Sequence, residues 1–125
     1  MSARKIFVAG HKGMVGSAIC RQLAKDGDVA VLKASRDELY ILSQSSEQNF
    51  LNQQMPDAII LAAAKVGGIH ANNLYPSRFI YENLQIQNNI IQGSHLADVQ
   101  SLIFLGSSCI YSKMAEQPMA EVALL

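Results

Sequence analysis

Two residues near the carboxyl end of the chain could do chemistry on a carbonyl group. Ser107 and Cys109 stand in the stretch "LIFLGSSCIYSK", directly after a continuous apolar run. The serine hydroxyl could donate a hydrogen bond to a substrate carbonyl oxygen, and the thiol, once ionised, could exchange a proton with the neighbouring carbon. A serine after a strand is, however, most often a turn or cap residue, and a cysteine is often a small buried apolar residue. This stretch therefore needs support from the rest of the chain.

A glycine-rich segment at the other end has the spacing of a dinucleotide-binding loop. It lies between a predicted strand, 5–9, and an amphipathic helical stretch, 14–25. In such loops the glycines permit a tight turn, close backbone approach to a pyrophosphate and close helix packing, and the helix N-terminus faces the phosphates. A strand-to-helix turn without a ligand is the alternative, but the strand and helix on either side favour binding. We expect the whole loop to contact the cofactor: Gly10, His11, Lys12, Gly13, Met14, Val15 and Gly16.

The residues after the second predicted strand, 29–32, favour NADP(H) over NAD. An NAD site normally has an acidic residue about 20 residues beyond the glycine loop. Here Ser35 and Arg36 precede Asp37. The planar guanidinium of Arg36 suits the oxygens of a 2′-phosphate, and Lys12 adds a second positive charge. The alternative is that Arg36 and Asp37 form a solvated pair in a turn.

The elements that would position these residues alternate between strand and helix. Beyond the elements already named, the pattern predicts a helix at 45–53, in which Ser45 and Gln48 have capping-box spacing. A strand at 58–64 and a glycine-bearing loop follow. The last elements are a helix from Pro76 to about Ala97 and a strand at 102–106. Continuously apolar strands that alternate with helices indicate an α/β fold, a Rossmann-like doubly wound parallel sheet in three α/β/α layers. We expect its first four strands in the order 3-2-1-4. Ligands bind at the carboxyl ends of such strands, where Ser107 falls.

Composition limits the class of protein. The chain has 125 residues, half of them hydrophobic, with ten basic and ten acidic residues. This length suits one domain, and the balanced charge predicts neither nucleic acid nor a membrane surface as a partner. The two cysteines, Cys20 and Cys109, form no CxxC motif, and no histidines cluster. We therefore expect no metal site and no disulfide, and the cytoplasm as the location.

Four stretches of the chain carry a resemblance to a known family: "VAGHKGMVGSAI", "LAAAKVGGIHANN", "YPSRFIYEN" and "FLGSSCIYSKMAEQPMAE". They resemble the GDP-L-fucose synthases, extended short-chain dehydrogenase/reductases that use NADPH, and the similarity runs along essentially the whole chain. The resemblance implies epimerisation of GDP-4-keto-6-deoxy-D-mannose at both carbons beside the keto group, then hydride transfer to the keto carbon. Ser107 would hydrogen-bond the keto oxygen, and Cys109 would donate or accept the proton in epimerisation. Further cofactor contacts are expected from Ala63, Lys65, Leu105 and Gly106.

The chain lacks one motif of these enzymes. Such reductases use a Tyr-x-x-x-Lys pair, but none of the four tyrosines here is followed by a lysine four positions later. In the resembling family this pair lies beyond the stretch that matches. A second epimerisation residue and the domain that binds the GDP-sugar also lie beyond it. We therefore interpret residues 1–125 as an amino-terminal NADP-binding portion that is inactive by itself. We expect a homodimer at full length, or a complementary carboxyl-terminal chain as partner.

Two other functions are possible on the same residues. A sugar-nucleotide epimerase or dehydratase with tightly held NAD would share the fold, but Arg36 and Cys109 disfavour it. A non-catalytic NADP-binding sensor or regulatory module would keep the glycine loop and dispense with Tyr-x-x-x-Lys. Ser107 and Cys109 argue against a sensor, because a sensor has no use for carbonyl chemistry.

Overall fold

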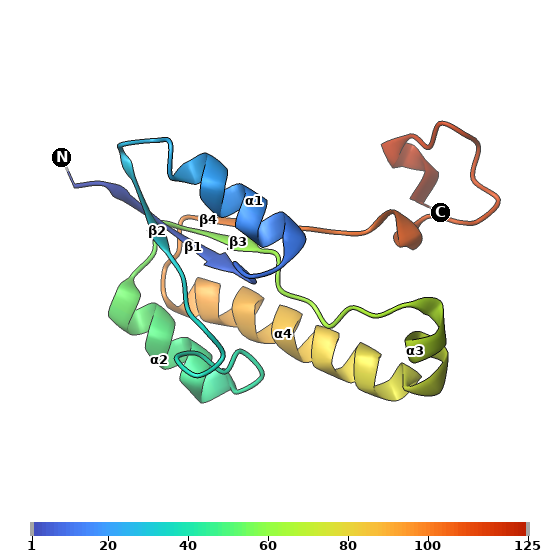
Figure 1. Ribbon diagram of the computed structural model, residues 1–125, viewed down its shortest axis with the longest axis horizontal. Coiled ribbons are helices and arrows are strands. Elements are labelled where there is room, and N and C mark those ends of the chain that lie inside the picture. Colours follow the sequence, from blue (N-terminus) through green and yellow to red (C-terminus); the bar gives the residue numbers. More distant parts are fainter. Residues whose placement is uncertain (1, 125) are drawn as a thin grey trace.

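Four parallel strands form one sheet in the computed structural model, which describes residues 2–124 (Figure 1). The strands are β1 (Arg4–Ala9), β2 (Val29–Leu32), β3 (Ala58–Leu61) and β4 (Ser101–Phe104), and their order is β2-β1-β3-β4. Every neighbouring pair is parallel. All four strands overlap the predicted ones.

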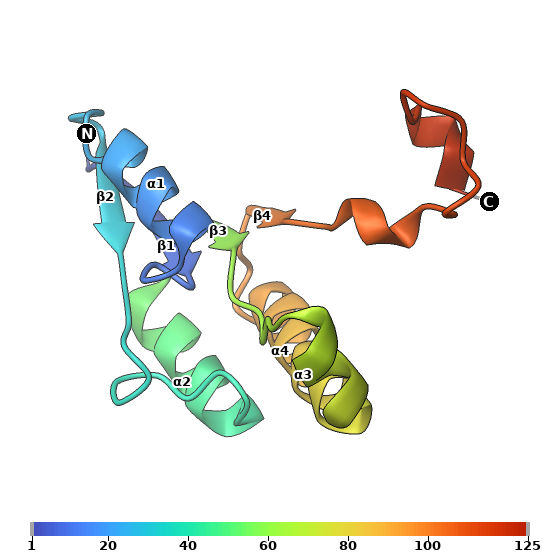
Figure 2. The same ribbon diagram turned by 45° about the vertical axis from the view of Figure 1, so that its right-hand side comes forward.

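Helices cover both faces of this sheet. They are α1 (Met14–Leu23), α2 (Gln44–Gln54), α3 (Ile69–Leu74) and α4 (Pro76–Leu96), followed by two short 3₁₀ turns, η1 (Ser108–Ile110) and η2 (Glu121–Leu124). Figures 1 and 2 show α1 on one face and α2 and α4 side by side on the other. Three layers around a parallel sheet confirm the predicted doubly wound, Rossmann-like class.

The side chains of β1 divide the core in two. Ile6 and Val8 belong to a first cluster, in which they pack with Cys20 of α1. Phe7 and Ala9 point to the opposite face of the sheet and belong to a second cluster. The second cluster also contains the fully buried residues Leu51, Ile59 and Ile90, from α2, β3 and α4. Because successive side chains of a strand point to opposite faces, a strand buried on both sides must be apolar throughout, as β1 is from Ile6 to Ala9.

The strand order differs from the predicted 3-2-1-4. In that order the third strand lies outside β2 and the fourth beside β1, but here β3 pairs with β1 and β4 pairs with β3. The reason lies between β2 and α2, where the chain turns instead of forming a strand. The N–H groups of Glu38 and Leu39 both donate to the carbonyl of Ser35, at 3.1 and 2.8 Å. The chain then passes across one face of the sheet through α2 (Figure 1). It adds β3 on the side of β1 that faces away from β2.

Several predicted boundaries were wrong by a few residues. Helix α2 is capped by Ser43 instead of Ser45, because Ser43 has an extended backbone and its Oγ accepts a 3.4 Å hydrogen bond from the N–H of Ser46. The predicted loop after β3 contains a short helix, α3. The side-chain amide of Asn72 supports it by donating to the carbonyls of Gly67 and Gly68, at 2.9 and 3.1 Å.

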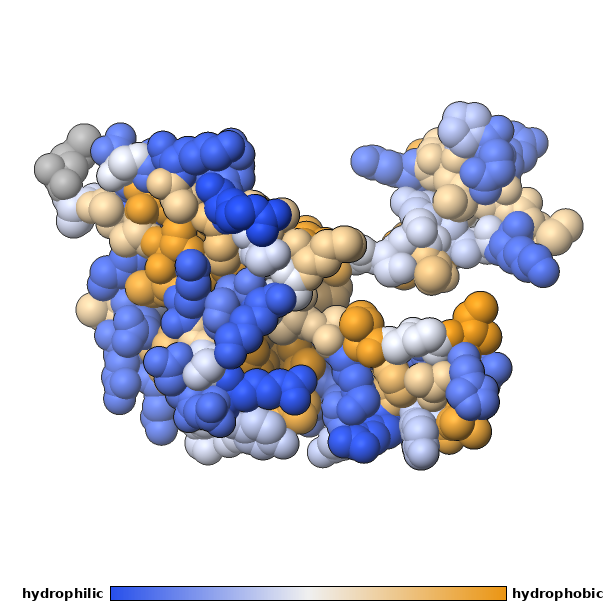
Figure 3. Space-filling model, viewed as in Figure 1, coloured by the Kyte–Doolittle hydropathy of each residue, from blue (hydrophilic) through white to orange (hydrophobic). Residues whose placement is uncertain are grey.

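The chain beyond β4 extends away from the sheet. The space-filling view shows it joined to the rest of the molecule by a narrow neck (Figure 3). Within residues 2–124, every hydrogen bond formed after Leu105 joins residues close in sequence, such as the 3.2 Å bond from the N–H of Ile110 to the carbonyl of Ser107. No helix in this described part of the chain is long and apolar enough to cross a membrane.

Candidate functional site

Gly10, in the loop after β1, and Gly16, in the first turn of α1, have no room for a side chain. Gly10 has a φ of +89°, and a Cβ added to it would lie 2.7 Å from backbone atoms of Ala62 and Ala63. A Cβ on Gly16 would overlap the carbonyl of Gly10. The first glycine therefore permits the turn and its contact with the loop after β3. The second lets α1 start directly against the turn.

The N-terminus of α1 is open to an anion. Its N-cap is Gly13, which offers no side-chain cap, and its first turn has no acidic residue. Lys12, Met14 and Val15 are exposed around it. A helix leaves the N–H groups of its first turn without internal partners, and its dipole adds partial positive charge there. This cradle fits the pyrophosphate of a dinucleotide.

The turn after β2 carries the residues expected to distinguish NADP from NAD. Arg36 and Asp37 are both exposed, and no ion pair joins them among residues 2–124. The N–H of Ser35 donates to Glu38 at 2.7 Å, and this bond, together with the charges of His11 and Lys12, lowers the pKa of the Glu38 carboxyl. The glycine loop and the β2 turn thus share one electrostatic environment, in which the Arg36 guanidinium is accessible.

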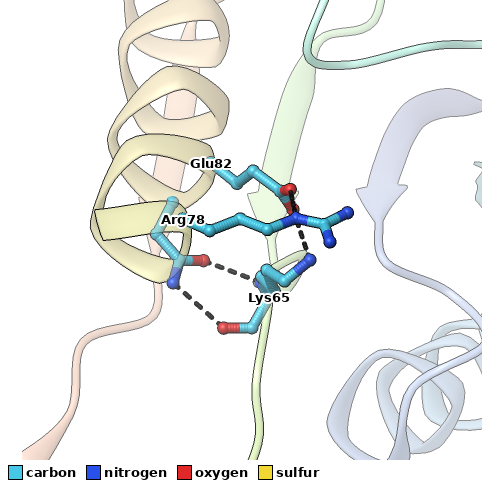
Figure 4. A network of polar contacts seen from close by, with 4 residues as sticks. Lys65, Arg78 and Glu82 are labelled. Carbon is cyan, nitrogen blue, oxygen red and sulfur yellow. Dashed lines mark hydrogen bonds and ion pairs between the residues drawn. The ribbon is translucent and has the colours of Figure 1, made fainter. Parts of the chain in front are cut away.

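The loop after β3 lies against α4 (Figure 4). The side-chain amide of Asn83 accepts from the N–H of Lys65 at 2.7 Å and donates to its carbonyl at 3.0 Å. The Lys65 ammonium pairs with Glu82 at 2.9 Å, and Glu82 also accepts from Arg78 at 2.7 Å. Hydrogen bonds from these two cations lower the pKa of Glu82. The Lys65 ammonium is therefore directed toward α4, and Ala63 and the loop backbone lie nearer the glycine loop.

The predicted catalytic residues lie in one turn at the end of β4. The N–H of Leu105 donates to the carbonyl of Leu61 at 3.3 Å, after which Gly106 leaves the sheet at its carboxyl edge. The Oγ of Ser107 accepts from the N–H of Cys109 at 3.2 Å, so this serine does cap a turn. Cys109 is free and exposed, which excludes a buried packing role within the described residues. Among the residues that the structure describes, no hydrogen bond links Ser107 or Cys109 to the glycine loop.

Helix α4 supplies polar contacts that sequence reasoning missed. Besides Asn83, the buried amide of Asn89 donates to the carbonyl of Ile41 at 2.7 Å and so holds the segment that leads from Arg36 to α2. Asn83, Ile86 and Ile90 follow the three- and four-residue spacing of one helix face. A polar residue at an apolar-face position is the signal that could have revealed them.

The topology defines where these groups meet. From β1 the chain continues to β2 on one side, whereas β3 and β4 lie on the other. Ligands of open α/β sheets bind at the carboxyl edge where the order reverses, here between the glycine loop and the loop after β3. The β2 turn and the end of β4 flank this part of the sheet edge. No cluster of residues that could hold a metal ion occurs within residues 2–124.

A protein-family model described as the NAD dependent epimerase/dehydratase family matches residues 6–124. The chain belongs to this family. Its relatives include the GDP-L-fucose synthase of Escherichia coli (strain K12), which is 55% identical over 125 residues, and GDP-L-fucose synthase 1 of Arabidopsis thaliana, which is 54% identical over 121. These matches cover 100% and 97% of this chain but 39% and 38% of the relatives. The chain thus spans about two fifths of the length of the curated relatives it matches.

Solved structures show the same fold. MlghC, a GDP-mannoheptose C4 reductase from Campylobacter jejuni with NADP bound, matches with a TM-score of 0.91 and 37% identity. The match covers 99% of this chain and 37% of MlghC. It therefore includes the segment that extends beyond β4, so the extended path is a shared feature of the two proteins.

Proposed function

We propose that the chain is the NADP-binding amino-terminal portion of a GDP-L-fucose synthase. Such an enzyme epimerises GDP-4-keto-6-deoxy-D-mannose at both carbons beside the keto group and reduces the product with NADPH. One observation supports this most strongly. The open N-terminus of α1, which has no acidic residue in its first turn, lies at the same sheet edge as the Ser107–Cys109 turn, in a chain 55% identical to the GDP-L-fucose synthase of E. coli.

In this proposal, different residues would hold the different parts of the cofactor. The N-terminus of α1, from Gly13 to Gly16, would hold the pyrophosphate. Arg36 and Lys12 would hold the 2′-phosphate, since a guanidinium binds phosphate oxygens through two hydrogen bonds and an ammonium adds charge. Ala63, Lys65, Leu105 and Gly106 would border the other half. When bound, NADPH supplies the hydride for the keto carbon.

Ser107 and Cys109 would supply one part of the epimerisation machinery, and the second epimerisation residue of the resembling enzymes would supply the other. Removing a proton from a carbon beside a ketone places negative charge on the keto oxygen, and a hydrogen bond from the Ser107 hydroxyl stabilises that charge. The Cys109 sulfur would take or return the carbon-bound proton. Because the two residues share one turn, they can address neighbouring atoms of one substrate. The acid that protonates the alcohol oxygen would come from a Tyr-x-x-x-Lys pair, which these 125 residues do not contain.

The remaining expectations belong to the same proposal. Both cysteines are free, which suits a reducing cytoplasm. The substrate would be a GDP-sugar, and the full-length enzyme would be a homodimer.

Titration of NADPH and NADH into the chain tests the proposed cofactor. We expect NADPH to bind more tightly, and Arg36→Ala to weaken NADPH by about tenfold or more while changing NADH little, because charge-assisted hydrogen bonds contribute about 1.5–3 kcal/mol each. Arg4→Ala is the matched control, since Arg4 is exposed at the amino end of β1. Equal losses for the two cofactors in Arg36→Ala would show that Arg36 does not read the phosphate. Absence of binding by the wild type would refute the cofactor assignment.

A further inference from the structure

The chain makes one closed turn, at residues 35–39, shortly after it leaves β2. The carbonyl of Ser35 accepts hydrogen bonds from the N–H groups of Glu38 and Leu39, at 3.1 and 2.8 Å. Leu39 is 3% exposed and belongs to the same core cluster as Phe7. The core therefore fixes the far end of the turn, whereas its start follows a strand that lies at the edge of the sheet.

The Glu38 side chain closes the start of this turn. Its carboxylate accepts a 2.7 Å hydrogen bond from the N–H of Ser35, while the N–H of Glu38 donates to the Ser35 carbonyl. The two residues thus bond reciprocally, as a capping box ties residues three positions apart. Within residues 2–124 the N–H of Ser35 has no second acceptor, so without the carboxylate the turn would be held from one side only.

Arg36 and Asp37 lie at the apex of the turn. Both are exposed, and neither side chain has a hydrogen bond or ion pair among the residues that the structure describes. The backbone of the turn is thus what directs the Arg36 side chain. A long side chain loses rotamer freedom when it binds a ligand, so a fixed backbone beneath it reduces the conformational entropy that binding still has to remove.

The charge of Glu38 does not by itself explain an acidic residue at this place. The N–H of Ser35 is the largest cause that lowers the pKa of the Glu38 carboxyl, and the charges of His11 and Lys12 lower it further. The group is therefore a carboxylate at neutral pH, and it would repel a 2′-phosphate bound nearby. The hydrogen bond inside the turn is a use of this carboxylate that is compatible with phosphate binding.

We propose that Glu38 is a positioning residue for the 2′-phosphate of NADP(H): it closes the Ser35–Leu39 turn and thereby presents Arg36. Glu38 does not contact the phosphate and acts through Arg36. This inference rests on the proposed cofactor and deepens it, because it explains why an acidic residue stands beside a phosphate-binding arginine.

Two substitutions separate the hydrogen bond of Glu38 from its charge. Glu38→Gln removes the charge and keeps an oxygen that can accept from the N–H of Ser35, whereas Glu38→Leu removes both. In titrations of the chain, we expect Glu38→Leu to weaken NADPH about fivefold and NADH less than about twofold, because only NADPH has the phosphate that Arg36 binds. Glu38→Gln should weaken NADPH by no more than about twofold.

An Arg36→Ala background tests whether Glu38 acts through Arg36. In that background Glu38→Leu should weaken NADPH no further, because the side chain that the turn presents is absent. Asp26→Leu is the matched control. Asp26 is also exposed and accepts a 3.0 Å hydrogen bond from a backbone N–H, that of Asp28, but it lies in the turn before β2. This variant should leave both affinities within about twofold of wild type.

Three results would overturn the positioning role and leave the proposed cofactor intact. They are equal weakening of NADPH and NADH by Glu38→Leu, a loss in Glu38→Gln as large as in Glu38→Leu, and the full effect of Glu38→Leu in the Arg36→Ala background. An NADPH affinity of Glu38→Leu equal to that of Asp26→Leu would overturn it too. A wild type that binds neither dinucleotide would instead overturn the proposed cofactor, and the positioning role with it.

Discussion

Glu47 is an ionisable residue in an apolar place. Its side chain on α2 is fully buried, and neither carboxyl oxygen has a hydrogen-bond partner among the described residues. Burial raises its pKa to about 7, from an ordinary value of 4.5. The carboxyl therefore stays protonated in the folded chain at pH values where it would ionise in the unfolded chain.

This shift predicts that stability falls as pH rises. Because the folded chain binds this proton more tightly than the unfolded chain does, the shift contributes fully to the free energy of unfolding below pH 4.5. This contribution is lost progressively as the pH rises to about 7. The loss should approach about 1.4 kcal/mol per pH unit across that window. Glu47→Gln, which cannot ionise, should flatten the dependence and be more stable than wild type at pH 8. Urea unfolding between pH 4.5 and 8 measures both effects.

Exposed Glu121 supplies the control for this measurement, since Glu121→Gln should keep the wild-type pH dependence. If Glu47→Gln kept it too, another group would be responsible.

The predictable and unpredictable residues differ in where their partners lie. The glycine loop and the Ser107–Cys109 turn are each formed by residues close together in the sequence, so the sequence alone could predict where these two turns lie. Asn83 and Glu47 gain their roles from distant contacts, with Lys65 and with α4. Local spacing carries no information about such partners, and both residues appear in the sequence as ordinary polar positions on helices.

At the level of elements, the Glu47 side chain of α2 packs against Gly93 of α4. A Cβ on Gly93 would collide with the Glu47 carboxyl group, whose Cδ would lie 2.7 Å away. Gly93 is also buried, and glycine inside a helix costs about 1 kcal/mol relative to alanine. The helix thus tolerates a poor helix former at this position because the facing carboxyl group occupies the space.

A double-mutant cycle should therefore show a change of sign. Gly93→Ala should destabilise the wild type by about 1 kcal/mol, because overpacking outweighs the helix propensity it gains. In a Glu47→Ala background the same substitution should stabilise by about 1 kcal/mol. Chemical denaturation of the four proteins gives the coupling, and additive effects would mean that the two side chains do not compete for space.

Element types were predictable, and their ends less so. Apolar runs and helical spacing identified all four strands and the three long helices. The cap of α2 was misplaced because Ser43, Ser45 and Ser46 are all good cap residues. Tertiary contact favours the first of them, since Asn89 holds the carbonyl of Ile41 just before it. Helix α3 was missed because it is short and depends on the Asn72 amide for support.

At the scale of the whole molecule, the strand order was the feature that pattern reasoning could not supply. An apolar run shows that a strand is buried, but it does not say on which side of β1 the strand adds. Here the tight turn at Ser35–Leu39 replaces a strand beside β2, and the chain then passes across one face of the sheet to the other side of β1. β3 therefore lies between β1 and β4. In this order, as in the predicted 3-2-1-4, β4 lies at the edge of the described sheet.

This edge should make the chain associate. Ile103, Phe104 and Leu105 are 52%, 49% and 40% exposed, and none carries a charge. An unpaired apolar edge is a template for pairing with another chain. Sedimentation should show association that rises with concentration, and Phe104→Lys should reduce it. Val122→Lys should not, although Val122 is 92% exposed, because it lies outside the sheet. A monomer over a wide concentration range, with the 102–106 amides protected from exchange, would contradict this prediction.

The most direct measurement of the proposed function is NADPH oxidation by a chimera. In it, this chain replaces the matching 39% of the E. coli GDP-L-fucose synthase. With GDP-4-keto-6-deoxy-D-mannose as substrate, we expect the chimera to oxidise NADPH and the 125-residue chain alone to show no activity. Ser107→Ala in the chimera should slow the reaction about 100-fold, because the keto oxygen loses its hydrogen-bond donor. A folded chimera that binds NADPH but is inactive, or one that Ser107→Ala leaves unchanged, would contradict the assignment of this chain to such an enzyme.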